Sequence, residues 1–217
     1  MSVIPAAHAV EREPSPTASC AGSGQWLEPL VSGAVIIRFG RDAQIVAQDE
    51  PSDYCFQVVS GCVRTAMELE DGRRQIGEFL FPGDIVGYNT DGGYPFSAAA
   101  VSEVTLRRFH LAAIEMHAMR DARFAQALRH YTAAQLHKAR LRHVLLGRAT
   151  AGERISYFIR EMRGHMLTSA TGQSEMPMKL MDVADYLGLA LETVCRGMAA
   201  SRRAGAAPVP DAMRLPL

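Results

Sequence analysis

Glu192 and Arg196 are the two side chains whose types and spacing suit the reading of base edges in a nucleic acid. They are four residues apart, so on a helix they project from the same face. A carboxylate can accept a hydrogen bond from cytosine N4, and a guanidinium can donate two to guanine O6 and N7. This pair could therefore read one G·C base pair and its neighbour.

The residues around this pair have the spacing of a helix-turn-helix. Ala184 is small where a second helix must cross closely, and Gly188 follows where the turn needs a residue that adopts positive φ. We predict a buried set that consists of Val183, Ala184, Leu187, Leu189, Val194 and Met198. The opposite face then carries Leu191, Glu192, Cys195 and Arg196. An ordinary helical hairpin, with Glu192 and Arg196 paired in solvent, is the alternative interpretation.

The charge of the chain is unevenly distributed. Its 23 basic and 23 acidic side chains cancel, so the total charge does not by itself indicate nucleic-acid binding. Basic residues outnumber acids in one stretch of the C-terminal half, at Arg120, Arg123, Arg129, Lys138, Arg140, Arg142 and Arg148. This is the local positive charge that phosphate contacts require. We expect double-stranded DNA to be contacted by Leu191, Glu192, Thr193, Cys195, Arg196, Arg202 and Arg203.

Cysteine usage and hydropathy indicate the compartment. The four cysteines, Cys20, Cys55, Cys62 and Cys195, form no CxxC pair, a pattern typical of a reducing, intracellular setting. No apolar run approaches the roughly 18 residues of a membrane span. The N-terminus lacks a charged segment followed by an apolar one, so no export signal is visible. We expect a cytoplasmic protein that does not bind membranes.

The first half of the chain predicts a β domain. Residues 1–24 are rich in Pro, Ala, Ser and Glu without periodicity, which is typical of a disordered tail. Residues 25–118 then contain short alternating segments separated by turn residues such as Asp71-Gly72. The predicted strands are 35–39, 54–59, 63–69, 74–80 and 101–109. Their regular spacing indicates a small antiparallel barrel or sandwich.

Residues 119–147 are predicted to form one long helix that holds a dimer. Apolar side chains recur at steps of three and four along a seam that only a lysine interrupts: Phe124, Ala127, Tyr131, Ala134, Lys138, Leu141 and Leu145. A second apolar row consists of Leu128, Leu136, Val144 and Leu146. One row could pack on the β domain while the seam meets a second copy, and symmetric dimers are the commonest oligomers. The alternative is a single amphipathic helix docked on its own domain.

Residues 148–217 contain the remaining helical signals. Thr150 and Glu153 have the spacing of a capping box, and the helix that they begin has a buried stripe formed by Ile155, Phe158, Ile159 and Met162. Residues 164–177 are predicted to be a polar loop before the helix-turn-helix. Residues 206–217 could form a hairpin that turns at 210–212. Its prolines remove hydrogen-bond donors, so such a wing would be short and loosely paired.

Together these segments resemble the cyclic-AMP-receptor/FNR superfamily of bacterial regulators, and within it the FixK-like branch. The resemblance covers about residues 35–203 and is carried by Gln57–Gly61, Val63–Thr65, Asp71–Gly77, Phe81–Gly87, Leu146–Arg148, Thr150, Glu153–Arg154 and the helix-turn-helix. It implies an α+β fold with an antiparallel β-roll (a double-stranded β-helix of the cyclic-nucleotide-binding type), a long dimerisation helix and a winged helix-turn-helix. It also implies a homodimer that binds a TTGA…TCAA palindrome and works with RNA polymerase. The positions that contact bases in the family match Glu192, Cys195 and Arg196.

Departures from the family pattern concern what the protein senses. Tyr88 and Phe96 stand where cyclic-AMP-binding members have a Glu and an Arg, so the phosphate and the ribose lose their polar anchors. Cys20 stands alone at the N-terminus, whereas FNR-type sensors hold an iron–sulfur cluster with several closely spaced cysteines there. His110 and His117 are candidates for a haem ligand, but histidines at such positions are mostly packed or solvated. FixK-like members generally carry no cofactor. We therefore expect no cyclic nucleotide, no cofactor and no metal.

Two further features leave a second hypothesis open. Ala190 replaces the Ser or Thr expected before the recognition helix, and loss of such a cap costs about 0.5–2 kcal/mol. Cys195 is a redox candidate, because oxidation would add bulk and negative charge where phosphates must approach. The alternative function is a redox- or haem-sensing regulator, or an effector-binding module, with impaired DNA binding. No nucleophile with a plausible base is visible, so we do not expect an enzyme.

Overall fold

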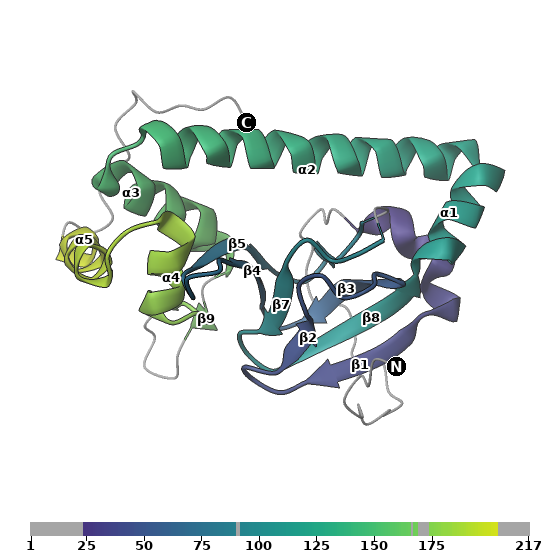
Figure 1. The fold of residues 1–217 in the computed structure, drawn as a ribbon, viewed down its shortest axis with the longest axis horizontal. Coiled ribbons are helices and arrows are strands. Elements are labelled where there is room, and N and C mark those ends of the chain that lie inside the picture. Colours follow the sequence, from purple (N-terminus) through teal and green to yellow (C-terminus); the bar gives the residue numbers. More distant parts are fainter. Residues whose placement is uncertain (1–23, 90–91, 166, 169–173, 204–217) are drawn as a thin grey trace. The chain divides into compact units, whose positions relative to one another are not determined.

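The structure is a computed structural model that describes residues 24–89, 92–165, 167–168 and 174–203 (Figure 1). The chain divides into two compact units, Met1–Thr132 and Ala133–Leu217. The tail predicted over residues 1–24, except Gly24, and the wing predicted over residues 206–217 lie outside the described residues.

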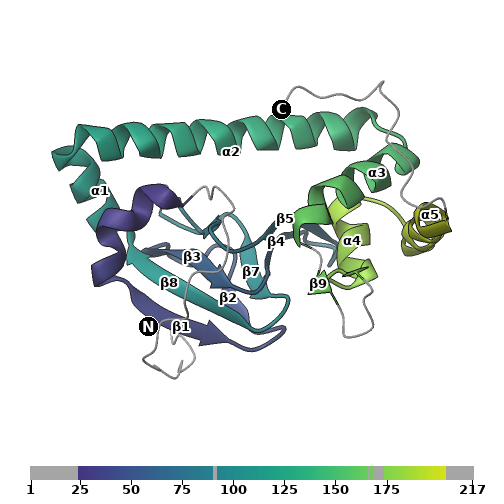
Figure 2. The same ribbon diagram turned by 180° about the vertical axis from the view of Figure 1, so that it is seen from behind.

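The N-terminal unit contains two four-stranded antiparallel sheets (Figure 2). In the first sheet the order is β1 (Val35–Phe39), β8 (Val104–His110), β3 (Tyr54–Ser60) and β6 (Ile85–Val86). In the second the order is β2 (Gln44–Val46), β7 (Ser97–Ala100), β4 (Val63–Glu68) and β5 (Arg74–Leu80). One core draws apolar side chains from both sheets, among them Ile37, Phe56, Leu106, Val63, Leu80 and Ala98. The predicted antiparallel β-roll is therefore confirmed.

The longer strands follow the predicted ones closely, whereas the short ones were missed. Strands β1 and β5 have the predicted bounds, and Gly72 forms the predicted β4–β5 turn with a φ of 81°. The strand predicted from Val101 begins only at Val104. Strands β2, β6 and β7 were not predicted. They have two to four residues each, and Ser97–Ala100 in particular is alanine-rich and has little intrinsic preference for strand.

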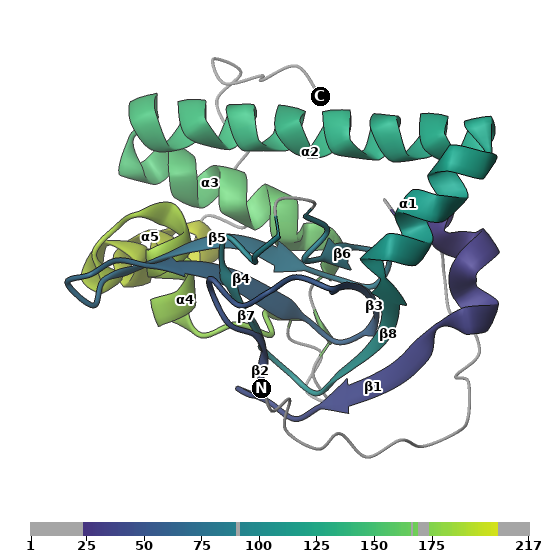
Figure 3. The same ribbon diagram turned by 45° about the vertical axis from the view of Figure 1, so that its right-hand side comes forward.

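Three helical segments lie at one end of the β-roll (Figure 3): the 3-10 helix η1 (Gln25–Gly33), α1 (Leu111–Arg120) and the beginning of α2 (Ala122–Arg148). Residues 119–120, which the sequence placed in the long helix, belong to α1. Asp121 separates the two helices, because its Oδ1 accepts hydrogen bonds from the amides of Arg123 (2.8 Å) and Phe124 (3.2 Å). Those amides, Phe124 first, lower the pKa of Asp121. The aspartate thus begins α2 as an N-cap.

Trp26 of η1 holds the first turns of α2 on the N-terminal unit. Its ring centroid lies 5.5 Å from those of Phe124 and Tyr131, and 5.8 Å from that of Tyr88. Phe124 and Tyr131 are buried, and Ala127 packs against the same cluster. This half of the predicted seam is therefore docked on its own domain, which was the alternative interpretation of the helix.

The C-terminal unit contains the rest of α2 from Ala133, α3 (Ala151–Met162), η2 (Arg163–His165), β9 (Leu167–Thr168), β10 (Ser174–Glu175), α4 (Leu180–Leu187) and α5 (Leu191–Arg203). The capping box is confirmed: Thr150 Oγ1 accepts from the Glu153 amide, and Glu153 Oε2 accepts from the Thr150 amide. In the predicted stripe of α3, Ile155, Phe158 and Met162 are buried and Ile159 is half-buried.

The segment predicted as a polar loop contains an antiparallel pair, β9 and β10, in which Ser174 lies opposite Thr168 and Glu175 opposite Leu167. The prediction of a loop throughout residues 164–177 was therefore wrong. Two-residue strands show no detectable alternation, because pairing with each other, rather than a buried face, defines them.

Gly188 connects α4 to α5 with a φ of 59° and a ψ of 44°, in the left-handed region that the sequence predicted. Gly188→Ala should lower the free energy of unfolding by about 1–2 kcal/mol, because a Cβ clashes with the following carbonyl in this conformation. Gly152→Ala is the matched control. Gly152 lies in the first turn of α3 with open space around its Cα, so there the same change should be neutral or stabilise by about 0.4–1 kcal/mol. Denaturant unfolding that gives equal values for the two variants would contradict this turn geometry.

Candidate nucleic-acid interface

The second helix of the predicted helix-turn-helix, α5, is held by its buried side. Val183, Ala184, Leu187, Val194 and Met198 are buried as predicted, whereas Leu189 is only half-buried. Helix α5 also packs closely on α3, because a Cβ at Gly197 would lie 2.3 Å from Ile155 Cδ1. The sequence analysis did not single out this glycine. These contacts fix which face of α5 points outward.

Glu192, Cys195 and Arg196 are exposed together on the outward face of α5. Leu191 and Thr193 beside them are half-buried, and Arg202 and Arg203 belong to the last turn of the helix. The predicted i, i+4 arrangement of Glu192 and Arg196 is thus present. This face presents one carboxylate, one thiol and one guanidinium to solvent.

The N-terminus of α5 has no side-chain cap at Ala190. The carbonyl of Ala190 instead accepts from the amides of Thr193 (3.0 Å) and Val194 (3.2 Å). The first amides of a helix carry a partial positive charge and favour anions. The alanine has no side-chain oxygen that would compete with a phosphate at this helix end, which precedes Glu192 and Arg196.

Arg142 was counted with the positive surface in the sequence analysis, but it is engaged inside the C-terminal unit. Its guanidinium lies 3.5 Å from the centre of the Tyr186 ring, and its Nη2 donates to the Tyr186 carbonyl at 2.8 Å. Arg154 is engaged in the same way, with Nη1 donating to the Leu187 carbonyl at 2.9 Å. Sequence reasoning missed this role, because nothing in a run of basic residues distinguishes a solvated arginine from one that caps a helix.

The β-roll positions that differ from the cyclic-AMP-binding pattern are both in apolar packing. Tyr88 belongs to the Trp26 cluster, and its ring centroid lies 6.4 Å from that of Tyr131. Burial raises the pKa of Tyr88, and the nearby Cys55 and Glu115 raise it further. Phe96 packs against the core between the two sheets. Neither position supplies the charged group that a cyclic phosphate or ribose needs.

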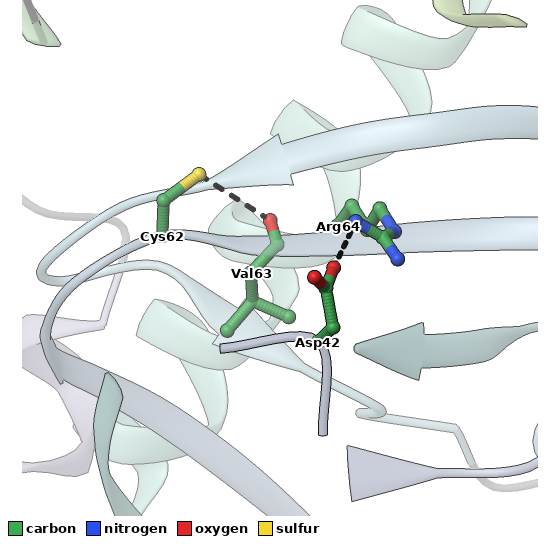
Figure 4. Close-up of polar contacts among 4 residues, drawn as sticks. All are labelled: Asp42, Cys62, Val63 and Arg64. Atoms are coloured by element: carbon green, nitrogen blue, oxygen red, sulfur yellow. Dashed lines mark hydrogen bonds and ion pairs between the residues drawn. The ribbon is translucent and has the colours of Figure 1, made fainter. Parts of the chain in front are cut away.

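Two cysteines and two histidines that the sequence analysis singled out contact neighbouring groups within the N-terminal unit. Cys55 and Cys62 are buried, and burial raises the pKa of Cys55 to about 12. The Cys62 thiol lies 3.9 Å from the Val63 carbonyl, next to an ion pair in which Arg64 Nη1 lies 3.4 Å from Asp42 Oδ1 (Figure 4). The rings of His110 and His117 contact those of Tyr54 and Phe124.

Among the residues that the structure describes, no three histidine, cysteine or acidic side chains are grouped so that they could hold a metal ion. None of the helices there combines the length and the apolarity that a membrane span needs.

The second half of α2 presents a different face from the predicted seam. Ala134 and Lys138 of the seam are exposed, Leu141 is half-buried and Leu145 is buried. The largest exposed apolar side chains of this helix belong to the second row, in which Leu136 is 52% and Val144 45% exposed. They are eight residues apart and lie on roughly the same side of the helix.

Comparison with known proteins shows a consistent set of relatives. Residues 36–121 match the family model of the cyclic nucleotide-binding domain. The chain is 37% identical over 180 residues to the nitrogen fixation regulation protein FixK of Azorhizobium caulinodans, covering 82% of this chain and 73% of that protein. It is 30% identical over 167 residues to the transcriptional activator protein FnrL of Cereibacter sphaeroides, covering 74% of this chain and 67% of that protein. Among solved structures, FixK2 from Bradyrhizobium japonicum is similar with a TM-score of 0.74 and 37% identity, over 79% of this chain and 86% of that one.

Proposed function

Because the chain belongs to the Crp/Fnr family of transcription regulators, in its FixK-like branch, we propose that it is a homodimer that reads a TTGA…TCAA-like palindrome in DNA without a bound effector. The observation that carries this proposal is the joint exposure of Glu192, Cys195 and Arg196 on one face of α5. The named relatives are regulators rather than enzymes. RNA polymerase is the protein partner that the resemblance implies.

Helix α5 is the element that we propose to enter the major groove as the second helix of a helix-turn-helix. Arg196 pairs with guanine, and Glu192 accepts from cytosine, because their spacing places both on the same groove-facing side. Arg202, Arg203 and the uncapped first turn supply phosphate contacts, which position the helix without reading sequence. Since the total charge of the chain is zero, binding depends on this local arrangement rather than on a general attraction.

The dimer surface that we propose is the exposed apolar row of α2. Phe124 and Tyr131 are buried against Trp26 of the same chain and offer little area to a partner. Leu136 and Val144 are the exposed alternative on the same helix, and both belong to the compact unit that contains α5. A palindrome requires two-fold symmetry, which an isologous contact of α2 with its copy provides.

An effector is not required for the arrangement that we propose. The core between the two sheets is formed by side chains of the chain itself, and it includes Tyr94, with Phe96 packed against it. Tyr88, together with Trp26 and Tyr131, connects the β-roll to α2 by ring contacts. Aromatic pairs of this kind contribute about 0.5–1.5 kcal/mol beyond their area burial. They hold the helix in place without a ligand.

Arg196→Ala should weaken binding to the cognate palindrome by about 1–3 kcal/mol and relax the preference at the guanine position, because the bidentate pair is lost. Arg202→Ala is the matched control on the same helix. Because Arg202 is proposed to contact phosphate, this substitution should weaken binding to cognate and scrambled duplexes to the same extent. Fluorescence anisotropy with both duplexes measures this. Equal losses on both duplexes for Arg196→Ala would make Arg196 a phosphate contact and refute its role as a base reader.

Leu136→Glu should produce a monomer that no longer binds the palindrome, because the substitution places a charge in a desolvated interface. Sedimentation at several concentrations measures the oligomeric state. His137→Glu adds the same charge to an exposed neighbouring position and should remain dimeric. Leu141→Glu tests the seam. If it runs as a folded monomer while Leu136→Glu stays dimeric, the seam and not the exposed row is the interface.

Cyclic AMP at millimolar concentration should leave the melting temperature unchanged. A ligand that binds only the folded state at 100 times its Kd raises stability by about 2.7 kcal/mol, so binding would be visible. Tyr88 and Phe96 provide no charge partner for the phosphate. The palindromic duplex serves as the positive control in the same assay, and a saturable shift with the nucleotide would refute the effector-free proposal.

A further inference from the structure

Two arginines donate to the carbonyls at the end of α4. Arg142 Nη2 donates to Tyr186 O at 2.8 Å, and Arg154 Nη1 donates to Leu187 O at 2.9 Å. The last carbonyls of a helix have no partner within the helix, and they form the negative end of its dipole. Two cations thus cap α4 immediately before Gly188, where the chain turns toward α5.

The same guanidinium of Arg154 also binds the end of α2. Its Nη2 donates to Leu146 O at 2.7 Å and its Nε to Ala149 O at 3.0 Å. Because the five N–H donors of a guanidinium have a fixed planar geometry, one side chain that binds two helix ends fixes how those ends lie toward each other. Helices α3 and α4 accordingly lie near the C-terminal end of α2 (Figures 1 and 2).

Arg142 acts from α2 through Tyr186. Its guanidinium stacks on the Tyr186 ring at 3.5 Å, and the Tyr186 hydroxyl donates to Glu161 Oε2 of α3 at 2.8 Å. The tyrosine is buried, and the Phe158 ring lies 5.5 Å from its own. Burial, reinforced by Glu161, raises the pKa of Tyr186, so its hydroxyl stays protonated as a donor. Tyr186 therefore contacts α2 through Arg142 and α3 through Glu161.

We propose that Arg142, Tyr186 and Arg154 fix the orientation of α5 relative to α2 and thereby determine the half-site spacing that the dimer accepts. The proposal rests on the proposed function, in which α2 joins the two copies and α5 reads one half-site. Arg142 and Arg154 are positioning residues, because they act on α5 through α4 and its turn.

The physical basis is the geometry of a duplex. Two half-sites are read from one side when their centres are about one helical turn, or 34–36 Å, apart. One extra base pair moves a half-site by about 3.4 Å along the axis and turns it by about 35°. If α5 is rigidly linked to α2, it cannot follow this change. If the link is loosened, α5 can follow the half-site, but affinity for the preferred spacing falls.

The test compares Arg142→Gln with wild type on palindromes whose spacer is one base pair shorter, unchanged, or one or two base pairs longer. A duplex with a single half-site measures recognition without spacing. Arg142→Gln should lose roughly two- to thirtyfold in affinity at the preferred spacing, the range typical of coupling networks. The loss of affinity that altered spacers cause, relative to the preferred spacer, should be smaller in this variant than in wild type. Its affinity for the single half-site should stay within about twofold of wild type.

Control variants separate positioning from stability. Arg148→Gln removes the same charge from an exposed position at the end of α2 and should retain the wild-type spacing penalty. Tyr186→Phe keeps the ring under Arg142 but removes the bond to Glu161, and Arg142→Lys keeps the charge but not the planar stack. Both variants should fold, which thermal unfolding verifies. In both, altered spacers should reduce affinity less than in wild type but more than in Arg142→Gln.

A spacing penalty in Arg142→Gln and Arg142→Lys that equals that of wild type overturns the proposal, even if the melting temperature falls, because the arginine is then only structural. Wild-type protein that binds all spacers equally overturns it as well. Wild-type protein that binds neither the palindrome nor the half-site removes the proposed function itself, which is a different result.

Discussion

The carbonyl groups that end α2 and α4 are the constraint on which the C-terminal unit depends. Backbone carbonyls removed from water need donors, and the last carbonyls of a helix have no partner within that helix. Arg154 supplies donors to both helix ends, and Arg142 adds one to α4. Helix α5 leaves the turn that follows α4 with Val194 buried and with Gly197 close to Ile155 of α3.

Helix α2 is held differently at its two ends. Near its beginning, Phe124 and Tyr131 pack around Trp26, a contact that is apolar and not directional. Near its end, directional hydrogen bonds from Arg154 to Leu146 O and Ala149 O define the geometry. Burial of aromatic area tolerates small displacements, whereas a planar fork of donors does not. The end of α2 that directional hydrogen bonds hold thus belongs to the same compact unit as α5.

Features that depend on neighbours in sequence were predictable, and features that depend on distant partners were not. The capping box of Thr150 and Glu153, the turn at Gly188 and the outward face of α5 follow from local spacing, and the structure has all three. Periodicity showed that α2 has apolar rows but not what covers them, because Trp26 lies almost a hundred residues earlier. Short strands such as Ser97–Ala100 exist through pairing with β2 and β4, which no single segment encodes.

Arg142 shows the same limit at the candidate site and changes the electrostatic argument. As one of several basic residues on α2 it was counted toward phosphate contact, yet its guanidinium is stacked on buried Tyr186. An arginine whose guanidinium is bound to helix carbonyls adds little to the electrostatic field that attracts a polyanion. In a chain whose charges cancel, fewer cations then remain for nonspecific attraction to DNA, and the function that we propose assigns selectivity to Glu192 and Arg196 and to the geometry that presents them.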